Sequence, residues 1–323
     1  MTSRERVLAA ITHQLVDRPP HIIDFTGDAH TKLQEHLGDQ PVAEFIANDV
    51  RDIPVPWWHW HELAADWRGA GVPTSRPRVL GRGTYDNLAD NLKAWREESD
   101  KYFLVRLYGI HFEKGYFARG FENFMADLGG ARDWARDLLR WIINKNLVMM
   151  ENFLALPEID GVLLGSDWGS QCGLLMSPAT WDDLIRPGEQ AMFDLVKSYG
   201  KDVWVHSCGN IERLIPTLIE MGLQVLNPVQ PECMDLAHLK AAYGDKLAFW
   251  GGISTQQTLP YGTPEQVRAE ARRVRDTLGP EGYIFSPSQS IQDDVPLANV
   301  LALLEVANEG SVPVDRRSRS QGG

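Results

Sequence analysis

From about residue 131 to residue 308, short apolar runs alternate with longer stretches in which apolar and polar positions recur at helical spacing. The short runs predict strands that are buried on both faces, and the longer stretches predict helices that connect parallel strands. The predicted strands are DGVLLGSDWG (160–169), DVWVHSCG (202–209), LQVLNPVQP (223–231), KLAFWGGI (246–253) and GYIFSPS (282–288).

Regular alternation of strand and helix is typical of two folds, the (β/α)8 barrel and the doubly wound sheet. A dinucleotide-binding doubly wound sheet carries a glycine-rich fingerprint at the start of a strand–helix unit. Because this chain has no such fingerprint at any of its units, we favour the barrel.

The first third of the chain is less regular. RPPHIIDF (18–25) and YFLVRLYG (102–109) predict earlier strands. Residues 76–87 have Pro, Gly and Asn spaced as in a hairpin or an excursion from the barrel. We therefore expect an α/β chain that forms a distorted (β/α)8 TIM barrel with an N-terminal elaboration. Residues 1–312 would form one domain, and residues 313–323 a disordered tail.

Composition narrows the classes of function. The formal net charge is -12, which gives no positive field to attract nucleic acid or anionic lipid. The chain has no run of 18 apolar residues, and its start is typical of an amphipathic helix rather than a signal peptide. We expect a cytoplasmic protein that binds a small molecule and neither nucleic acid nor membrane. Three cysteines are too few for a disulfide framework.

Polar side chains follow most of the predicted strands at their carboxyl ends, where parallel α/β folds build their active sites. A turn-capping role for Asp167 and a turn role for Asn227 are the ordinary alternatives. Because polar side chains end several strands together, the sequence nevertheless predicts a shared polar site. The strand ends carry Asp167, His206 with Cys208, Asn227 with Gln230, the pair Gly251 and Gly252, and Ser286 with Gln289.

His206 and Cys208 are two positions apart, so in an extended chain their side chains project to the same side. Imidazole nitrogen and thiolate sulfur are both good zinc ligands, but a catalytic zinc site normally has three protein ligands. Two residues alone do not establish a metal site. A hydrogen-bonding histidine and a buried, inert thiol remain the alternatives.

Motifs along nearly the whole chain together resemble the uroporphyrinogen decarboxylase superfamily. They are RERVLAAITHQLVDRPP, GSDWGSQ with SPATW, HSCGNI, NPVQP, FWGGI, LPYGTPEQV and SIQDDVPLANVLAL, in this order. The resemblance implies a distorted (β/α)8 barrel with its pocket at the carboxyl ends of the strands. It also implies one of two chemistries: decarboxylation of a tetrapyrrole without a cofactor, or methyl transfer to or from a corrinoid, often with zinc on a His-x-Cys pair and a later cysteine.

The decarboxylases of that superfamily have an arginine-rich segment after the Pro-rich N-terminal strand, which binds substrate carboxylates. Here residues 19–36 contain no arginine and include Asp24 and Asp28. Such a segment would repel a polycarboxylate, which disfavours decarboxylation of uroporphyrinogen.

The HSCG segment resembles the methyltransferase branch, with His206 and Cys208 as the matching metal ligands. Gln289 or Ser290 stands where that branch would have its third ligand, and an uncharged amide is a poor zinc ligand. Cys172, Cys233 and Glu113 are candidates to complete the site. The chain also has no Asp-x-His-x-x-Gly signature of corrinoid-binding domains, so the resemblance implies a corrinoid carried by a separate protein.

Our leading hypothesis is a methyltransferase that moves a methyl group between a small substrate, such as an aromatic methyl ether, and a corrinoid protein. Zinc on His206 and Cys208 would act as a Lewis acid, and Asp167 and His206 would be the catalytic residues. The alternatives are a cofactor-free decarboxylase, with His206 as proton donor, and a non-catalytic small-molecule-binding barrel; a homodimer stays open. The candidate substrate-binding residues are Asp24, Glu113, Asn227, Gln230 and Gln289. The tryptophan-rich residues 55–63 predict packing or a wall of the pocket.

Overall fold

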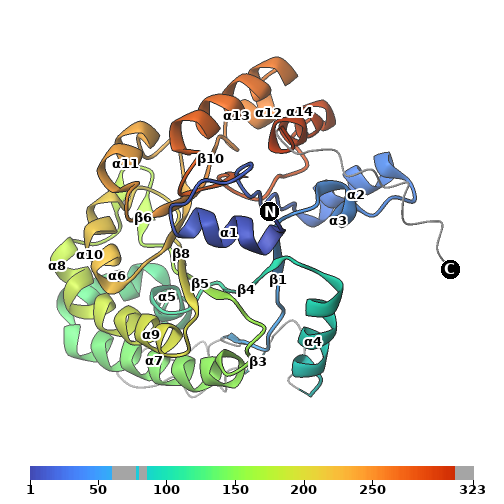
Figure 1. The fold of residues 1–323 in the computed structure, drawn as a ribbon. Helices are drawn as coiled ribbons and strands as arrows, with labels where there is room; N and C mark the ends of the chain where they lie inside the picture. The colour runs from blue at the N-terminus through green and yellow to red at the C-terminus, as the bar shows by residue number, and fades with distance from the viewer. Residues whose placement is uncertain (60–77, 80–85, 310–323) are drawn as a thin grey trace.

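Seven parallel strands form a curled sheet in the computed structural model, which describes residues 1–59, 78–79 and 86–309 (Figure 1). All neighbouring pairs in this sheet are parallel. The order across the sheet is β1 (Val50–Asp52), β4 (Tyr102–Leu107), β5 (Gly161–Gly165), β8 (Asp202–His206), β9 (Val225–Val229), β10 (Ala248–Ile253) and β11 (Tyr283–Pro287).

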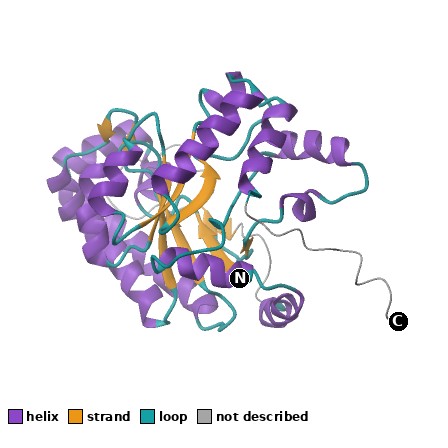
Figure 2. Cartoon of the chain, turned by 45° about the horizontal axis from the view of Figure 1, so that its top comes forward, coloured by secondary structure: helices purple, strands orange, loops and turns teal. Residues whose placement is uncertain are grey.

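Helices cover the outer face of the sheet and connect its strands (Figure 2). The α/β class and the parallel sheet are therefore confirmed, and so are the five strands expected after residue 131. The connecting helices are α4 (Leu88–Glu98), α5 (Phe112–Arg119), α6 (Phe121–Gly130), α7 (Arg132–Leu154), α8 (Pro178–Thr180), α9 (Arg186–Ser198), α10 (Ile215–Met221), α11 (Leu236–Tyr243), α12 (Thr258–Tyr261) and α13 (Pro264–Leu278), followed by α14 (Leu297–Ala307). A π-helical turn, Trp181–Ile185, joins α8 to α9, and a 3-10 turn, Glu212–Leu214, precedes α10.

Local sequence explains where these helices begin. At α13, Thr263 is the N-cap, Pro264 is the first helical residue, and Gln266 completes a capping box with Thr263. Proline fits the first turn because its missing N–H would have no partner there in any case. Asp235 caps α11 in a similar way, because its carboxylate accepts from the N–H groups of Ala237 and His238.

Two buried apolar clusters lie on opposite faces of the sheet. The inner cluster contains Leu163, Trp204 and Ile284 from three different strands, together with Val7 from α1 (Ser3–Ile11). The larger cluster contains the alternate positions of the same strands, such as Val203, and packs against the outer helices. Because side chains alternate along a strand, one sheet serves both clusters. The inner cluster fills the curl of the sheet, and α1 packs against it.

Residues 20–25 lie between the two edge strands of the sheet. The N–H of Ile22 donates to the carbonyl of Phe285 at 3.0 Å, and the N–H of Phe285 donates to the carbonyl of Pro20 at 2.8 Å. On the other side, the N–H of Asp49 donates to the carbonyl of His21 at 3.0 Å. The edge strand β11 and the residue that precedes β1, Asp49, are thus both bonded to this segment.

The expected strand at residues 18–25 forms only isolated bridges, at His21 and Phe25, and that prediction was wrong in its extent. Pro19 and Pro20 have no N–H to donate, so a continuous ladder cannot form there. The N-terminal elaboration contains α2 (Gly27–Leu37) and α3 (Val42–Ile46).

Short antiparallel pairs lie outside the large sheet. The expected hairpin at residues 76–87 falls largely outside the described residues. Its described parts are residues 86–87 and β3 (Arg78–Val79), which pairs with β2 (Trp58–His59). A second pair is β6 (Gly169–Ser170) with β7 (Gly173–Leu174). The predicted tail at residues 313–323 also lies outside the described residues. Among the helices described, none combines the length and the apolar character needed to cross a membrane.

Candidate functional site

Polar side chains continue the inner face of the strands where the apolar residues end. On β8, Trp204 is in the inner cluster, and His206 is the next residue on the same face. On β9, Asn227 follows Val225 in the same way, and main-chain pairing places His206 opposite Asn227. Strand periodicity and register therefore bring the two polar side chains together at the carboxyl ends of the strands.

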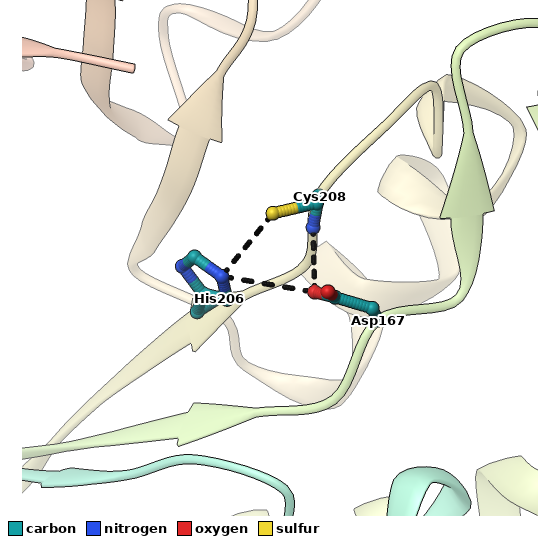
Figure 3. A group of neighbouring side chains, drawn as sticks. All are labelled: Asp167, His206 and Cys208. Carbon is teal, nitrogen blue, oxygen red and sulfur yellow. Dashed lines mark hydrogen bonds and ion pairs between the residues drawn. The ribbon is translucent and has the colours of Figure 1, made fainter. Parts of the chain in front are cut away.

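Asp167, His206 and Cys208 converge just beyond these strand ends (Figure 3). The Nε2 atom of His206 lies 3.4 Å from the Sγ atom of Cys208 and 3.7 Å from Oδ1 of Asp167. Among the described His, Cys, Asp and Glu residues, these three form a group whose candidate ligand atoms all lie within 4.8 Å of one another. The carboxylate of Asp167 is thus the third donor beside the His-x-Cys pair.

The donor set fits a zinc ion in type and spacing. Tetrahedral zinc with bonds of about 2.0 to 2.3 Å places its ligand atoms roughly 3.3 to 3.7 Å apart. The two distances from His206 Nε2, 3.4 and 3.7 Å, agree with that range. One nitrogen, one sulfur and one carboxylate oxygen would leave a fourth position for a substrate atom.

Asn227 orients the imidazole of His206. Its Nδ2 group donates to the carbonyl of Trp250 at 3.5 Å, which leaves Oδ1 to accept from Nδ1 of His206 at 2.6 Å. Burial lowers the pKa of His206, although Asp167 and Asn227 offset part of this effect. The ring is therefore neutral near pH 7, with its free lone pair on Nε2, the atom that faces Cys208 and Asp167.

Cys208 is held in a tight turn. The N–H of Cys208 donates to Oδ1 of Asp167 at 2.8 Å, and Nε2 of Gln289 donates to the sulfur at 2.8 Å. The next residue, Gly209, has a φ of 82°, and a Cβ there would lie 2.5 Å from the carbonyl oxygen of Ser170. Only glycine fits this turn without strain.

The surroundings of Cys208 disfavour a free thiolate. Burial and, to a smaller extent, the Asp167 carboxylate raise the pKa of Cys208 to about 12, although the hydrogen bond from Gln289 works in the opposite direction. A thiol and a carboxylate held this close favour a bound cation, because the cation would replace the thiol proton and offset the repulsion between the two groups.

The other predicted site residues lie at different distances from this group. Oε1 of Gln230 accepts from the N–H of Gly209 at 3.4 Å, so Gln230 supports the turn. Glu113 accepts from the Tyr116 hydroxyl at 2.9 Å; burial raises its pKa, and the nearby Asp167 raises it further. The described structure does not include Glu113, Cys172 or Cys233 in the group of candidate ligands, and Cys172 is exposed to solvent.

A pocket of about 690 Å³ opens beside His206. Its size suits a small organic molecule, since ligand pockets are typically about 300 to 1,000 Å³. Trp57 and Trp58, from the tryptophan-rich segment, are both buried, and Trp57 lines this pocket. Trp60 lies outside the described residues. The polar lining includes Asp24, Asn48, Asp52, Arg106, Tyr108, His206, Gln289 and Ser290.

Arg106 is a pocket residue that sequence reasoning missed. It occupies the inner face of β4 after Tyr102 and Leu104, and its Nη1 atom lies 2.5 Å from Oδ2 of Asp24. Burial alone would lower the pKa of Arg106, but Asp24 more than offsets this, and the guanidinium stays charged. The sequence did contain a signal for Arg106, because it is a charged residue at the same alternate positions of the strand as the inward-facing Tyr102 and Leu104. The pocket therefore contains an arginine, although the segment at residues 19–36 has none.

Comparison with known proteins supports the motif-based resemblance. Over 132 residues the chain is 33% identical to uroporphyrinogen decarboxylase of Azoarcus sp. (strain BH72), and the matched region covers 40% of this chain and 33% of that protein. Over 137 residues it is 28% identical to the methylcobamide:CoM methyltransferase MtaA of Methanosarcina barkeri, and the matched region covers 42% of this chain and 38% of that protein. The matched parts thus span well under two thirds of either relative.

The fold has a solved counterpart over almost its whole length. A methyltransferase from Methanosarcina mazei superposes with a TM-score of 0.69 at 17% identity, covering 96% of this chain and 99% of that one. Identity this low supports the fold alone. The family model for uroporphyrinogen decarboxylase (URO-D) matches residues 114–310, more than half of the chain. This chain belongs to the uroporphyrinogen decarboxylase (URO-D) family.

Proposed function

We propose that this chain is a zinc-dependent methyltransferase that moves a methyl group between a small substrate and a corrinoid on a separate protein. The observation that carries the proposal is the convergence of Asp167, His206 and Cys208 beside the large pocket. The relative named a methylcobamide:CoM methyltransferase provides a precedent for corrinoid chemistry in related sequences. We further propose that the curled sheet and residues 20–25 together form a distorted (β/α)8 barrel with an N-terminal elaboration.

Asp167, His206 and Cys208 would hold the zinc, which supplies a Lewis acid for the substrate heteroatom when bound. Asn227 keeps the His206 lone pair directed at the site. Gln289 donates to the Cys208 sulfur and so stabilises negative charge on it. The pocket walls hold the substrate beside the three donors and limit the access of water.

The corrinoid would arrive with a partner, because the sequence has no Asp-x-His-x-x-Gly signature to bind cobalt itself. The partner would approach at the carboxyl ends of the strands, where the three donors lie.

Zinc analysis combined with a methyl-transfer assay tests this function. Purified protein should contain about one zinc per chain. It should exchange methyl between methylcobalamin and an acceptor, followed by the change in the corrinoid absorption spectrum. Removal of zinc by a chelator should abolish the exchange, and added zinc should restore it. Full activity in metal-free protein would contradict the proposal.

A cofactor-free decarboxylase is the second candidate, and two observations favour it: the similarity to uroporphyrinogen decarboxylases and the presence of Arg106 in the pocket. In this case Asp167 would stabilise a developing cation, and His206 would donate a proton. The enzyme would then release carbon dioxide without any corrinoid. Cys208→Ala would keep the activity, and Asp167→Asn would lose it, whereas methyl transfer should depend on both residues.

A further inference from the structure

Two loops continue the neighbouring strands β5 and β8 and lie side by side. Where the strands end, the N–H of Ser166 donates to the carbonyl of His206 at 3.0 Å. Further along each loop, the N–H of Asn210 donates to the carbonyl of Ser170 at 2.8 Å. Two of the candidate zinc ligands lie between these main-chain contacts, one on each loop.

Between those two contacts, side chains replace the main chain as acceptors. Oδ1 of Asp167 accepts from the N–H of Cys208 at 2.8 Å (Figure 3). In the opposite direction, Oγ of Ser207 accepts from the N–H of Trp168 at 2.9 Å. Each loop thus supplies one side-chain oxygen that binds a main-chain N–H of the other loop. Because the two contacts join adjacent residues on both loops, together they fix the position of Asp167 beside Cys208.

Ser207 acts from behind the site. Side chains alternate along an extended chain, so Ser207 projects to the same side as Val205 and away from His206 and Cys208. Val205 and Trp168 both belong to the larger apolar cluster, which packs against the outer helices. Ser207 has no surface exposed to solvent. Its hydroxyl can therefore influence a bound metal only through the loop that it holds.

The main-chain N–H of Trp168 depends on this acceptor. Trp168 is only 1% exposed, and a buried N–H that loses its partner is costly because no water replaces the bond. Without the Ser207 hydroxyl, the loop would have to move until this N–H reached water or another acceptor. Asp167 directly precedes Trp168 and would move with it.

We propose that Ser207 is a positioning residue that sets the spacing between the Asp167 carboxylate and the His206–Cys208 pair. The inference deepens the proposed function and rests on it as far as zinc is concerned. Replacing a residue that orients metal ligands typically lowers metal affinity 10- to 100-fold. The contact with Trp168 is a property of the metal-free chain, so it can also be tested without zinc.

Zinc affinity separates this role from a general effect on stability. Ser207→Ala should bind zinc roughly 10- to 100-fold more weakly than the wild type, measured by competition with a chromogenic chelator. Ser254→Ala is the matched control, because Ser254 is also buried and its Oγ accepts from the N–H of Gln257 at 3.0 Å. This control should also lower the melting temperature, but it should keep the zinc affinity of the wild type.

Cobalt(II) in place of zinc reports the arrangement of the ligands, because its visible absorption bands depend on ligand geometry. The bands should shift in Ser207→Ala and stay unchanged in Ser254→Ala. A change in stability alone would not move them.

Amide hydrogen exchange in the metal-free protein tests the contact itself. In the wild type, the amide of Trp168 should exchange about 100-fold more slowly than in an unstructured chain. In Ser207→Ala, the amides of Trp168 and Cys208 should both exchange about tenfold faster than in the wild type, because Asp167 moves away from Cys208.

An unprotected Trp168 amide in the wild type would overturn the inference, and this measurement does not require any variant to fold. A folded Ser207→Ala with wild-type zinc affinity, cobalt spectrum and amide exchange would also overturn it, as would an equal loss of zinc affinity in Ser254→Ala. If the wild type binds no zinc but the amides respond as expected, the proposed function fails and the positioning of Asp167 by Ser207 stands. Zinc-dependent methyl transfer that is unchanged in Ser207→Ala would do the reverse.

Discussion

Nδ1 of His206 donates a hydrogen bond to Oδ1 of Asn227 at 2.6 Å, and this contact determines which ring nitrogen faces Cys208 and Asp167. Ligating histidines almost always donate their second ring N–H to an oxygen, which fixes the ring and raises its basicity. The two residues are 21 positions apart and lie opposite each other on neighbouring strands. The register of β8 and β9 therefore shapes the candidate metal site.

Replacing Asn227 tests this arrangement. Asn227→Leu removes the acceptor at similar volume, and we expect zinc affinity to fall roughly 10- to 100-fold because the imidazole loses its fixed orientation. Competition with a chromogenic chelator measures the affinity. The control is Asn152→Leu on the exposed face of α7, which should bind zinc like the wild type. Unchanged affinity in Asn227→Leu would remove the main support for His206 as a ligand.

Asp167 can be tested without disturbing the turn that it supports. In Asp167→Asn the side-chain oxygen can still accept from the N–H of Cys208, but the charge is lost. The binding free energy of zinc held by four ligands is about 10–16 kcal/mol, roughly a quarter of it from each ligand. Loss of one good ligand should therefore weaken zinc binding on the order of 100-fold. Zinc content after dialysis and the melting temperature should be measured together. The expected result is zinc loss together with a melting temperature equal to that of the metal-free wild type.

Full zinc content in Asp167→Asn would show that the carboxylate is not a ligand. If that variant also stopped releasing carbon dioxide from a carboxylated substrate, the decarboxylase reading would replace the metal one. The matched control is Asp183→Asn, an exposed carboxylate that pairs with Arg132 and Arg136 away from the candidate ligands.

Stability against acid should depend on Asp49. This buried carboxylate accepts from Nη1 of Arg6 and Nη1 of Arg18, both at 2.8 Å, and from the N–H of His21 at 2.9 Å. Burial alone would raise the pKa of Asp49, but His21 and Arg18 lower it by more, and the net pKa lies below its ordinary value. Its contribution to stability is therefore complete above the unfolded pKa, about 3.9, and is lost as the pH falls through the lower, folded pKa.

We expect Asp49→Asn to lower the free energy of unfolding at pH 7 by roughly 3 to 5 kcal/mol, because two guanidinium groups lose their buried partner. The difference from the wild type should narrow only below about pH 4. Urea denaturation at several pH values measures both effects. Asp137→Asn, which removes an exposed ion pair with Arg140, should leave stability nearly unchanged. A difference that stays the same down to pH 2 would contradict the assignment.

Strand patterns predicted much of this molecule because their physical cause is local. Apolar runs identified the strands β5, β8, β9, β10 and β11. The rule that parallel strands end on one edge predicted that Asp167, His206 and Asn227 are neighbours. What the sequence could not supply was a distance between loops. Asp167 and Cys208 are 41 residues apart, and their contact depends on the pairing of Gly165 with His206 and on the turn at Gly209.

Other misses had different causes. The segment at residues 18–25 has the apolar character of a strand, but Pro19 and Pro20 cannot donate to a ladder, and only bridges form. The pairing of Arg106 with Asp24 joins residues 82 positions apart, so searching residues 19–36 for arginine could not reveal it. The alternation of Tyr102, Leu104 and Arg106 did contain the signal.

The last prediction concerns Gln289, which with Ser290 is one of the two residues where the motif-based resemblance implies a further metal ligand. Its Nε2 atom lies 2.8 Å from the sulfur of Cys208, so a nitrogen donor introduced at this position would be next to the candidate zinc. We expect Gln289→His to tighten zinc binding on the order of 100-fold, by the share of one ligand in a four-ligand site. It should also slow methyl transfer, because the imidazole would occupy the coordination position otherwise left for the substrate. Gln230→His is the matched control and should not gain affinity, because the side chain of Gln230 accepts from the N–H of Gly209. Gln289→His alone should thus bind zinc more tightly and transfer methyl more slowly. If its zinc affinity and its methyl-transfer rate both stay unchanged, Gln289 does not face the metal.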